Sequence, residues 1–180
     1  AKYIILSKPG ESLQKMNERQ EVCFRIIGTK FLEYLDSLQS NAVVKPLRLY
    51  CGGTAGSGKS LIIKKVRELF NDYEKEYILA VAAYTGAAAC NIDGRTLQSV
   101  IHENPKRDSG GTNKENLEND VQHLQFLIID EISLVGSSLL AKANGRLNEG
   151  KGFKQGSYVR KPFSHMFRRF SPTYTCTRPS

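Results

Sequence analysis

Eight consecutive residues carry the strongest chemical pattern in the chain. They read Gly53-Thr54-Ala55-Gly56-Ser57-Gly58-Lys59-Ser60, which fits the pattern G-x-x-x-x-G-K-[ST]. Glycines let the backbone N–H groups of such a loop turn inward, where they and the start of the next helix attract anions. The pattern predicts a cradle for the phosphates of ATP. Lys59 would reach the β- and γ-phosphates, and the Ser60 hydroxyl would bind Mg²⁺.

The residues on either side of this loop predict the elements that hold it. Leu47, Leu49 and Cys51 alternate as in a strand, and apolar residues follow the loop at helical spacing from Ile62 to Phe70. We therefore expect a strand over 47–51, the loop, and a helix that begins near Lys59. The alternative is a glycine-rich turn that arose by chance.

A second pattern places two acids at the end of an apolar run. Phe126-Leu127-Ile128-Ile129 predicts a buried strand, and Asp130 and Glu131 follow it directly. In open α/β sheets, ligands bind at the carboxyl ends of the strands. Asp130 is expected to help hold Mg²⁺, and Glu131 to polarise the attacking water as general base. The alternative is a strand that ends in a solvated acidic turn.

The remaining patterns supply the elements around these two sites. Asn17 and Gln20 have the spacing of a capping box, at the start of an apolar stripe that runs to Leu38. A continuous apolar run over 77–83 predicts a strand, and Thr96 is expected to cap a short helix through Ile101. Residues 103–120 are polar and turn-rich, and a last helix is expected around Leu140, Ala143 and Leu147.

Alternating strands and helices predict an α/β fold with a parallel sheet and helices on both faces. With the phosphate loop, this is the core of a P-loop NTPase that resembles RecA. We expect a lead-in over 1–15, one ATP-binding domain over 16–148 and a basic tail over 149–180.

The positive charge of the chain is concentrated at its end. The net charge is +8, but residues 151–180 hold seven Lys or Arg and no acid, which leaves 19 bases against 18 acids in 1–150. A broad DNA-binding face therefore does not follow from the net charge. The tail mixes arginines with aromatic residues, a composition suited to nucleic acid, although a disordered tail is the favoured interpretation.

Two further features concern the setting of the protein. The four cysteines are scattered without metal-ligand spacing, which favours reduced thiols in an intracellular protein over a zinc site. No apolar run approaches the ~20 residues that cross a bilayer, so no membrane association is expected.

The ordered set of motifs resembles the Pif-type ATP-dependent DNA helicases of superfamily one. The resemblance covers residues 16–148 and rests on five segments beside the acids: Met16-Asn17-Glu18-Arg19-Gln20, the loop at 52–60, Thr85-Gly86-Ala87-Ala88, Asn91-Ile92-Asp93-Gly94 and Thr96-Leu97-Gln98-Ser99. Asp130-Glu131-Ile132-Ser133 completes the set.

The resemblance assigns further roles. By its position, Gln20 looks like the family's adenine-reading glutamine, whose amide can both donate hydrogen bonds to the base edge and accept them from it. Thr85, Gly86, Thr96 and Gln98 are similar in position to contacts with single-stranded DNA. The resemblance implies 5′-to-3′ unwinding in DNA repair, recombination and telomere maintenance, in the nucleus or the mitochondrion. Tyr84 and Gln98 stand where the family usually has Pro and His.

The end of the chain departs from the resemblance. The family continues into a Gly-Asp element and a second RecA-like domain that supplies arginine fingers, whereas this chain has no acid after Glu149. The sequence is thus expected to be the N-terminal ATP-binding lobe, with a truncated or mispredicted end. It should bind Mg·ATP, hydrolyse it feebly at most, and not unwind DNA alone. Three alternatives stay open: a P-loop kinase, a non-enzymatic nucleic-acid-binding fragment of a decayed transposon helicase, and a fragment that does not fold.

Overall fold

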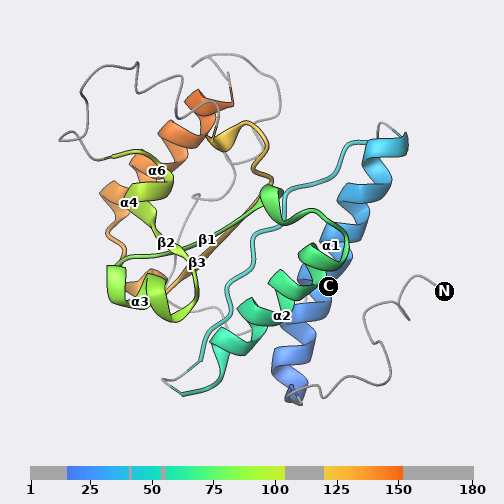
Figure 1. Ribbon diagram of the computed structural model, residues 1–180, viewed down its shortest axis with the longest axis horizontal. Helices are drawn as coiled ribbons and strands as arrows, with labels where there is room; N and C mark the ends of the chain where they lie inside the picture. The colour runs from blue at the N-terminus through green and yellow to red at the C-terminus, as the bar shows by residue number, and fades with distance from the viewer. Residues whose placement is uncertain (1–15, 41, 54–55, 104–119, 152–180) are drawn as a thin grey trace. The chain divides into compact units, whose positions relative to one another are not determined.

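The computed structural model describes residues 16–40, 42–53, 56–103 and 120–151 (Figure 1). Their helices and strands belong to two compact units, one ending at Glu74 and the other beginning at Lys75. The expected lead-in, most of the polar loop after Glu103 and the basic tail after Lys151 lie outside the described residues.

The first unit contains two long helices, as expected. Helix α1 spans Glu18–Ser40 and helix α2 spans Lys59–Asp72. The Phe31 ring stacks on Phe70 with centroids 4.0 Å apart and meets Tyr73 edge-on at 5.4 Å. The stripe of apolar residues in each helix therefore packs against the other helix, and the buried side chains of α2 are Ile62, Ile63, Val66, Leu69 and Phe70.

The prediction of a strand over 47–51 is wrong. Residues 42–53 contain neither helix nor strand, and the Leu47 and Tyr50 side chains are 36% and 57% exposed. A strand is stable only when its backbone N–H and C=O groups pair with a neighbouring strand. The described elements of this unit are helices, so the alternation of Leu49 and Cys51 finds no pairing partner within it.

The second unit is built on a parallel three-stranded sheet, which confirms the expected α/β class. Strand β1 spans Leu79–Ala83, β2 spans Arg95–Thr96 and β3 spans Phe126–Asp130, and their spatial order is β2-β1-β3. Ala83 of β1 pairs in register with Thr96 of β2 and with Asp130 of β3. The carboxyl ends of all three strands therefore lie at the same edge.

The described residues of this unit also form α3 over Gly86–Asn91, α4 over Leu97–Val100, α6 over Ser137–Gly150 and the 3₁₀ turns η2 over Glu76–Ile78 and η4 over Ile132–Leu134. Helices α4 and α6 lie together on one side of the strands (Figure 1). Leu97, Val100, Leu140 and Leu147 from these helices form one buried core with Ala82 of β1. One face of the sheet is thus covered by helices, and the expected cover of the other face stays a prediction.

Two strands differ in detail from the expectation. The apolar run at 77–83 begins as the 3₁₀ turn η2, in which Ile78 is buried and Tyr77 is 61% exposed. The residues of β3 are half-buried, whereas full burial was expected. Among the described strands, β3 pairs only with β1, and an edge strand has fewer neighbours to cover it.

Gly94 allows the turn between α3 and β2 to pass close to β1. A Cβ atom at Gly94 would lie 2.6 Å from the Val81 carbonyl oxygen and 3.3 Å from Ile92. Gly94→Ala should therefore lower the free energy of unfolding by about 1–3 kcal/mol, as overpacking does elsewhere. Urea denaturation measures this directly.

Gly145→Ala is the matched control, because a Cβ atom there meets nothing within 4 Å and the residue lies inside α6. This variant should gain up to about 1 kcal/mol from helix propensity. Equal effects at the two positions would contradict the close approach at Gly94.

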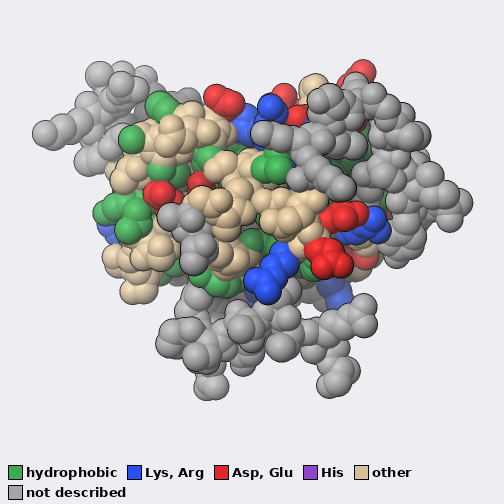
Figure 2. All heavy atoms as spheres, turned by 90° about the horizontal axis from the view of Figure 1, so that it is seen from below, with side chains coloured by type: hydrophobic (Ala, Val, Ile, Leu, Met, Phe, Trp, Pro, Cys, Tyr) green, Lys and Arg blue, Asp and Glu red, His purple; other side chains and the backbone are tan. Residues whose placement is uncertain are grey.

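The described surface carries mixed charge. Lys and Arg side chains lie beside Asp and Glu side chains on the face drawn in Figure 2. The helices of the first unit contain ion pairs within one turn, between Arg25 and Glu21 and between Lys65 and Glu68. Among the described helices, none combines the length and apolarity that a membrane crossing requires.

Candidate functional site

The described part of the phosphate loop has the backbone that its sequence predicts. Gly56 and Gly58 both have φ of +76°, a conformation that glycine adopts without strain. Helix α2 begins at Lys59, directly after Gly58, and its first turn contains no acid. The loop therefore leads into the positive end of a 14-residue helix. Thr54 and Ala55 lie outside the described residues.

The Lys59 side chain folds back across this loop. Its Nζ donates to the Gly53 carbonyl oxygen at 2.9 Å and to Ser57 Oγ at 3.3 Å. A Cβ atom at Gly53 would lie 2.6 Å from Ser57 Oγ, so any other residue there would displace the Ser57 hydroxyl from its present position. Ser60 lies exposed in the first turn of α2. The ammonium group is thus positioned by the loop that it would serve.

Gln20 joins the same loop to the start of α1. The capping box is confirmed: Asn17 N donates to Gln20 Oε1 at 2.8 Å, and Gln20 N donates to Asn17 Oδ1 at 3.0 Å. In addition, Gln20 Nε2 donates to the carbonyl oxygens of Ser57 at 2.9 Å and Gly58 at 3.3 Å. Sequence reasoning found the cap through its spacing but missed the contact with the loop. The adenine-reading role stays a prediction.

The two acids lie at the carboxyl end of β3, as expected. Asp130 is half-buried, and its Oδ1 accepts a hydrogen bond from the Glu131 N–H at 2.9 Å. Glu131 is exposed and has φ of +51°, in the left-handed region that non-glycine residues avoid. Such strain costs about 1–3 kcal/mol and concentrates at functional sites. Among the described residues, Glu74, Asp93 and His102 also have positive φ, so the role of Glu131 as general base stays a prediction.

The residues expected to contact DNA lie at the carboxyl edge of the same sheet. Thr85 and Thr96 follow or end strands β1 and β2, and each caps a short helix: their hydroxyls accept from Ala88 N and Ser99 N, both at 3.2 Å. Gly86 is exposed at the start of α3. Gln98 is half-buried, and its Oε1 has no hydrogen-bond partner among the described residues. Helix capping is a sufficient structural reason for threonine at both positions. The DNA contacts therefore stay predictions.

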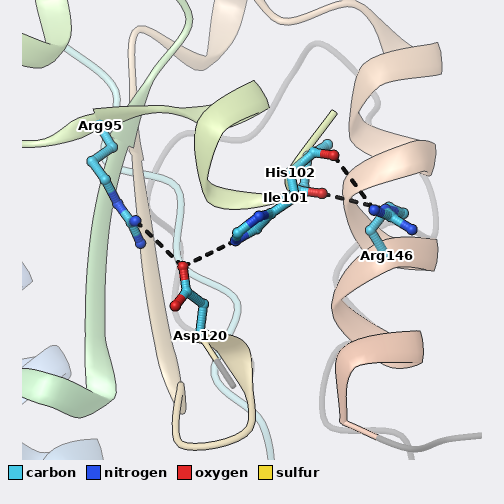
Figure 3. A network of polar contacts seen from close by, with 5 residues as sticks. All are labelled: Arg95, Ile101, His102, Asp120 and Arg146. Atoms are coloured by element: carbon cyan, nitrogen blue, oxygen red, sulfur yellow. Dashed lines mark hydrogen bonds and ion pairs between the residues drawn. The ribbon is translucent and has the colours of Figure 1, made fainter. Parts of the chain in front are cut away.

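A polar network fixes the end of the helix that carries Gln98 (Figure 3). Arg146 of α6 donates to the carbonyl oxygens of Ile101 at 3.3 Å and His102 at 3.4 Å. His102 Nε2 lies 2.9 Å from Asp120 Oδ2, and Arg95 approaches the same carboxylate at 3.7 Å. No sequence pattern predicted these contacts, because they join segments that are far apart in the chain.

These residues form two groups. The loop and Gln20 belong to the unit that ends at Glu74, and the acids, Thr85 and Thr96 belong to the unit that begins at Lys75. A glycine loop leading into a helix, together with an acid pair at the end of a parallel strand, defines the class: an α/β phosphate-loop protein.

The comparisons with known proteins identify the family. The model described as an AAA domain matches residues 38–150, more than half of the chain, and the chain therefore belongs to this family. No solved structure matches it.

The expected resemblance to Pif-type helicases is confirmed. The ATP-dependent DNA helicase PIF1 of Candida albicans is 34% identical over 116 residues, which cover 57% of this chain and 12% of that protein. The ATP-dependent DNA helicase RRM3 of Saccharomyces cerevisiae is 38% identical over 107 residues, covering 56% and 15%. The chain thus spans a small part of the length of these relatives.

Proposed function

We propose that this chain binds Mg·ATP and provides the nucleotide-binding lobe of an ATP-dependent DNA helicase. The observation that carries the proposal is the loop itself. Two glycines with left-handed backbone lead into α2, and the Lys59 ammonium is held across the turn. Relatives named ATP-dependent DNA helicases support the wider activity.

Side-chain oxygens of the kind that Mg²⁺ binds are present at Ser60 and Asp130. Within the part of the chain that the structure describes, no three His, Cys, Asp or Glu side chains form a metal cluster. Mg²⁺ does not need one, because it binds through one or two carboxylates, substrate phosphates and water. Ser60 and Asp130 would supply the protein oxygens. When bound, the ion would neutralise charge on the β- and γ-phosphates.

The remaining roles follow from the same chemistry. Glu131 would accept a proton from the attacking water, and Lys59 would stabilise charge on the transferred phosphoryl group. Only the resemblance supports an adenine contact for Gln20, because its amide already bonds to Asn17 and to the loop. The Asp130-Glu131 pair favours water as the nucleophile over a kinase acceptor.

The DNA partner is proposed to be a single strand that crosses the carboxyl edge of the sheet near Thr85, Gly86, Thr96 and Gln98. Such contacts follow the sugar-phosphate backbone, so their affinity falls with salt and depends little on sequence. We propose 5′-to-3′ translocation, a role in DNA repair, recombination and telomere maintenance, and a location in the nucleus or the mitochondrion. The relatives' names support the helicase role alone.

Thermal unfolding tests nucleotide binding. A ligand present at 100 times its Kd stabilises the folded state by about 2.7 kcal/mol, which corresponds to about 5–10 °C for a chain of this size. Mg·ATP should therefore raise the Tm by this amount, and ATP with EDTA should raise it less. The absence of any cooperative transition would support the alternative of a fragment that does not fold. A normal transition without a shift would contradict nucleotide binding.

A further inference from the structure

The Gln20 side chain uses both ends of its amide in one buried position. Its Oε1 accepts from Asn17 N, and its Nε2 donates to the Ser57 and Gly58 carbonyl oxygens. The residue is 9% exposed, so few water molecules compete for these hydrogen bonds. One side chain thus ties the first turn of α1 to the end of the phosphate loop, 37 and 38 residues further along the chain.

These contacts determine where two backbone amides point. In a trans peptide, the C=O group and the N–H group of the next residue point in opposite directions, and the described residues contain no cis peptide. The Ser57 and Gly58 carbonyls face Gln20. The N–H groups of Gly58 and Lys59 therefore point away from Gln20. Both belong to the amides that a phosphate loop uses to bind its ligand.

The contact between Gln20 and the loop requires glycine at position 58. A Cβ atom there would lie 2.4 Å from Gln20 Nε2, and its φ of +76° already favours glycine. The same carbonyl of Gly58 also accepts a turn-type hydrogen bond from Leu61 N at 3.1 Å, at the start of α2. Gln20 therefore braces the junction between the loop and α2.

We propose that Gln20 is a positioning residue for the phosphate loop, which it holds in the conformation that binds a polyphosphate chain whatever base is attached. This inference rests on the proposed function, since it assumes that the loop binds phosphate. It differs from adenine reading, in which the same amide atoms would contact the base and would act only on adenine nucleotides.

Binding without a base separates the two roles. Isothermal titration calorimetry on the full chain would compare Mg·tripolyphosphate, Mg·ATP and Mg·GTP. Gln20→Met, which keeps the length of the side chain but no polar atom, should weaken all three by about tenfold, because both hydrogen bonds to the loop are lost. Asn17→Ala removes the acceptor for Gln20 N but leaves both loop contacts, and should stay within about twofold of wild type.

A second variant tests whether the loss of affinity comes from a weakened cap of α1 instead of from the lost loop contacts. Gln20→Glu keeps an oxygen for the Asn17 N–H but has no N–H for the Ser57 and Gly58 carbonyls. It should therefore retain the helix cap and still weaken tripolyphosphate binding at least as much as Gln20→Met.

Three results would overturn the proposal. Loss of ATP affinity with unchanged tripolyphosphate affinity in both Gln20 variants would assign the residue to adenine. An equal loss in Asn17→Ala would assign the effect to the cap. A wild-type chain that binds neither tripolyphosphate nor ATP would overturn the proposed function as well, a result distinct from the first two.

Discussion

Lys59→Ala is expected to lower the affinity for Mg·ATP by about ten- to hundredfold, the effect of removing a charged hydrogen-bond donor. The structure places the ammonium group within the loop, 2.9 Å from the Gly53 carbonyl oxygen. A γ-phosphate would replace this weaker neutral acceptor with a charged one. Calorimetry or a fluorescent ATP analogue measures the change.

Lys64→Ala provides the matched control for this loss. Lys64 lies in the same helix, is exposed and sits one turn beyond the loop. It should leave the affinity within about twofold of wild type, since surface charges are screened by salt. Equal losses at Lys59 and Lys64 would indicate a general charge effect rather than a phosphate site.

Glu131→Gln is expected to leave Mg·ATP binding intact and to slow hydrolysis by about 10²–10⁴-fold, the usual contribution of a general base. Glutamine has nearly the shape of glutamate but cannot accept the proton. Because basal hydrolysis is expected to be feeble, the release of labelled phosphate should be followed with the protein in excess over ATP.

Glu149→Gln is the control for hydrolysis. Glu149 is exposed near the end of α6 and pairs with Arg146 at 3.4 Å, and no role in hydrolysis is assigned to it. It should hydrolyse ATP like wild type. A Glu131→Gln variant with the wild-type rate would remove Glu131 from the mechanism.

Local chemistry made much of the fold predictable. The capping box at Asn17 and Gln20 and the hydroxyl cap at Thr96 need only residues three positions apart, and both formed as expected. The helical stripes of α1 and α2 also follow from short-range spacing. The strand expected over 47–51 failed because a strand depends on a partner that spacing along the chain does not reveal.

The same distinction holds at the site. The glycine backbone of the loop and the start of α2 at Lys59 were predictable, because that motif encodes its own conformation. The contact between Gln20 and the loop joins residues 37 positions apart, and the left-handed backbone at Glu131 replaces an ordinary turn. Neither has a signal in residue spacing. The Gln20 contact arises from the packing of distant segments.

We propose that Ser60 and Asp130 hold the same magnesium ion, and this is the part of the proposed function that most needs a direct test. A double-mutant cycle on Mg·ATP affinity with Ser60→Ala and Asp130→Asn tests it most directly. If both residues hold the same ion, the second substitution should cost little once the first is made, and the double variant should bind within about twofold of the weaker single variant. If the fold-loss of affinity in the double variant equals the product of the two single fold-losses, Ser60 and Asp130 act independently, which would contradict a shared ion.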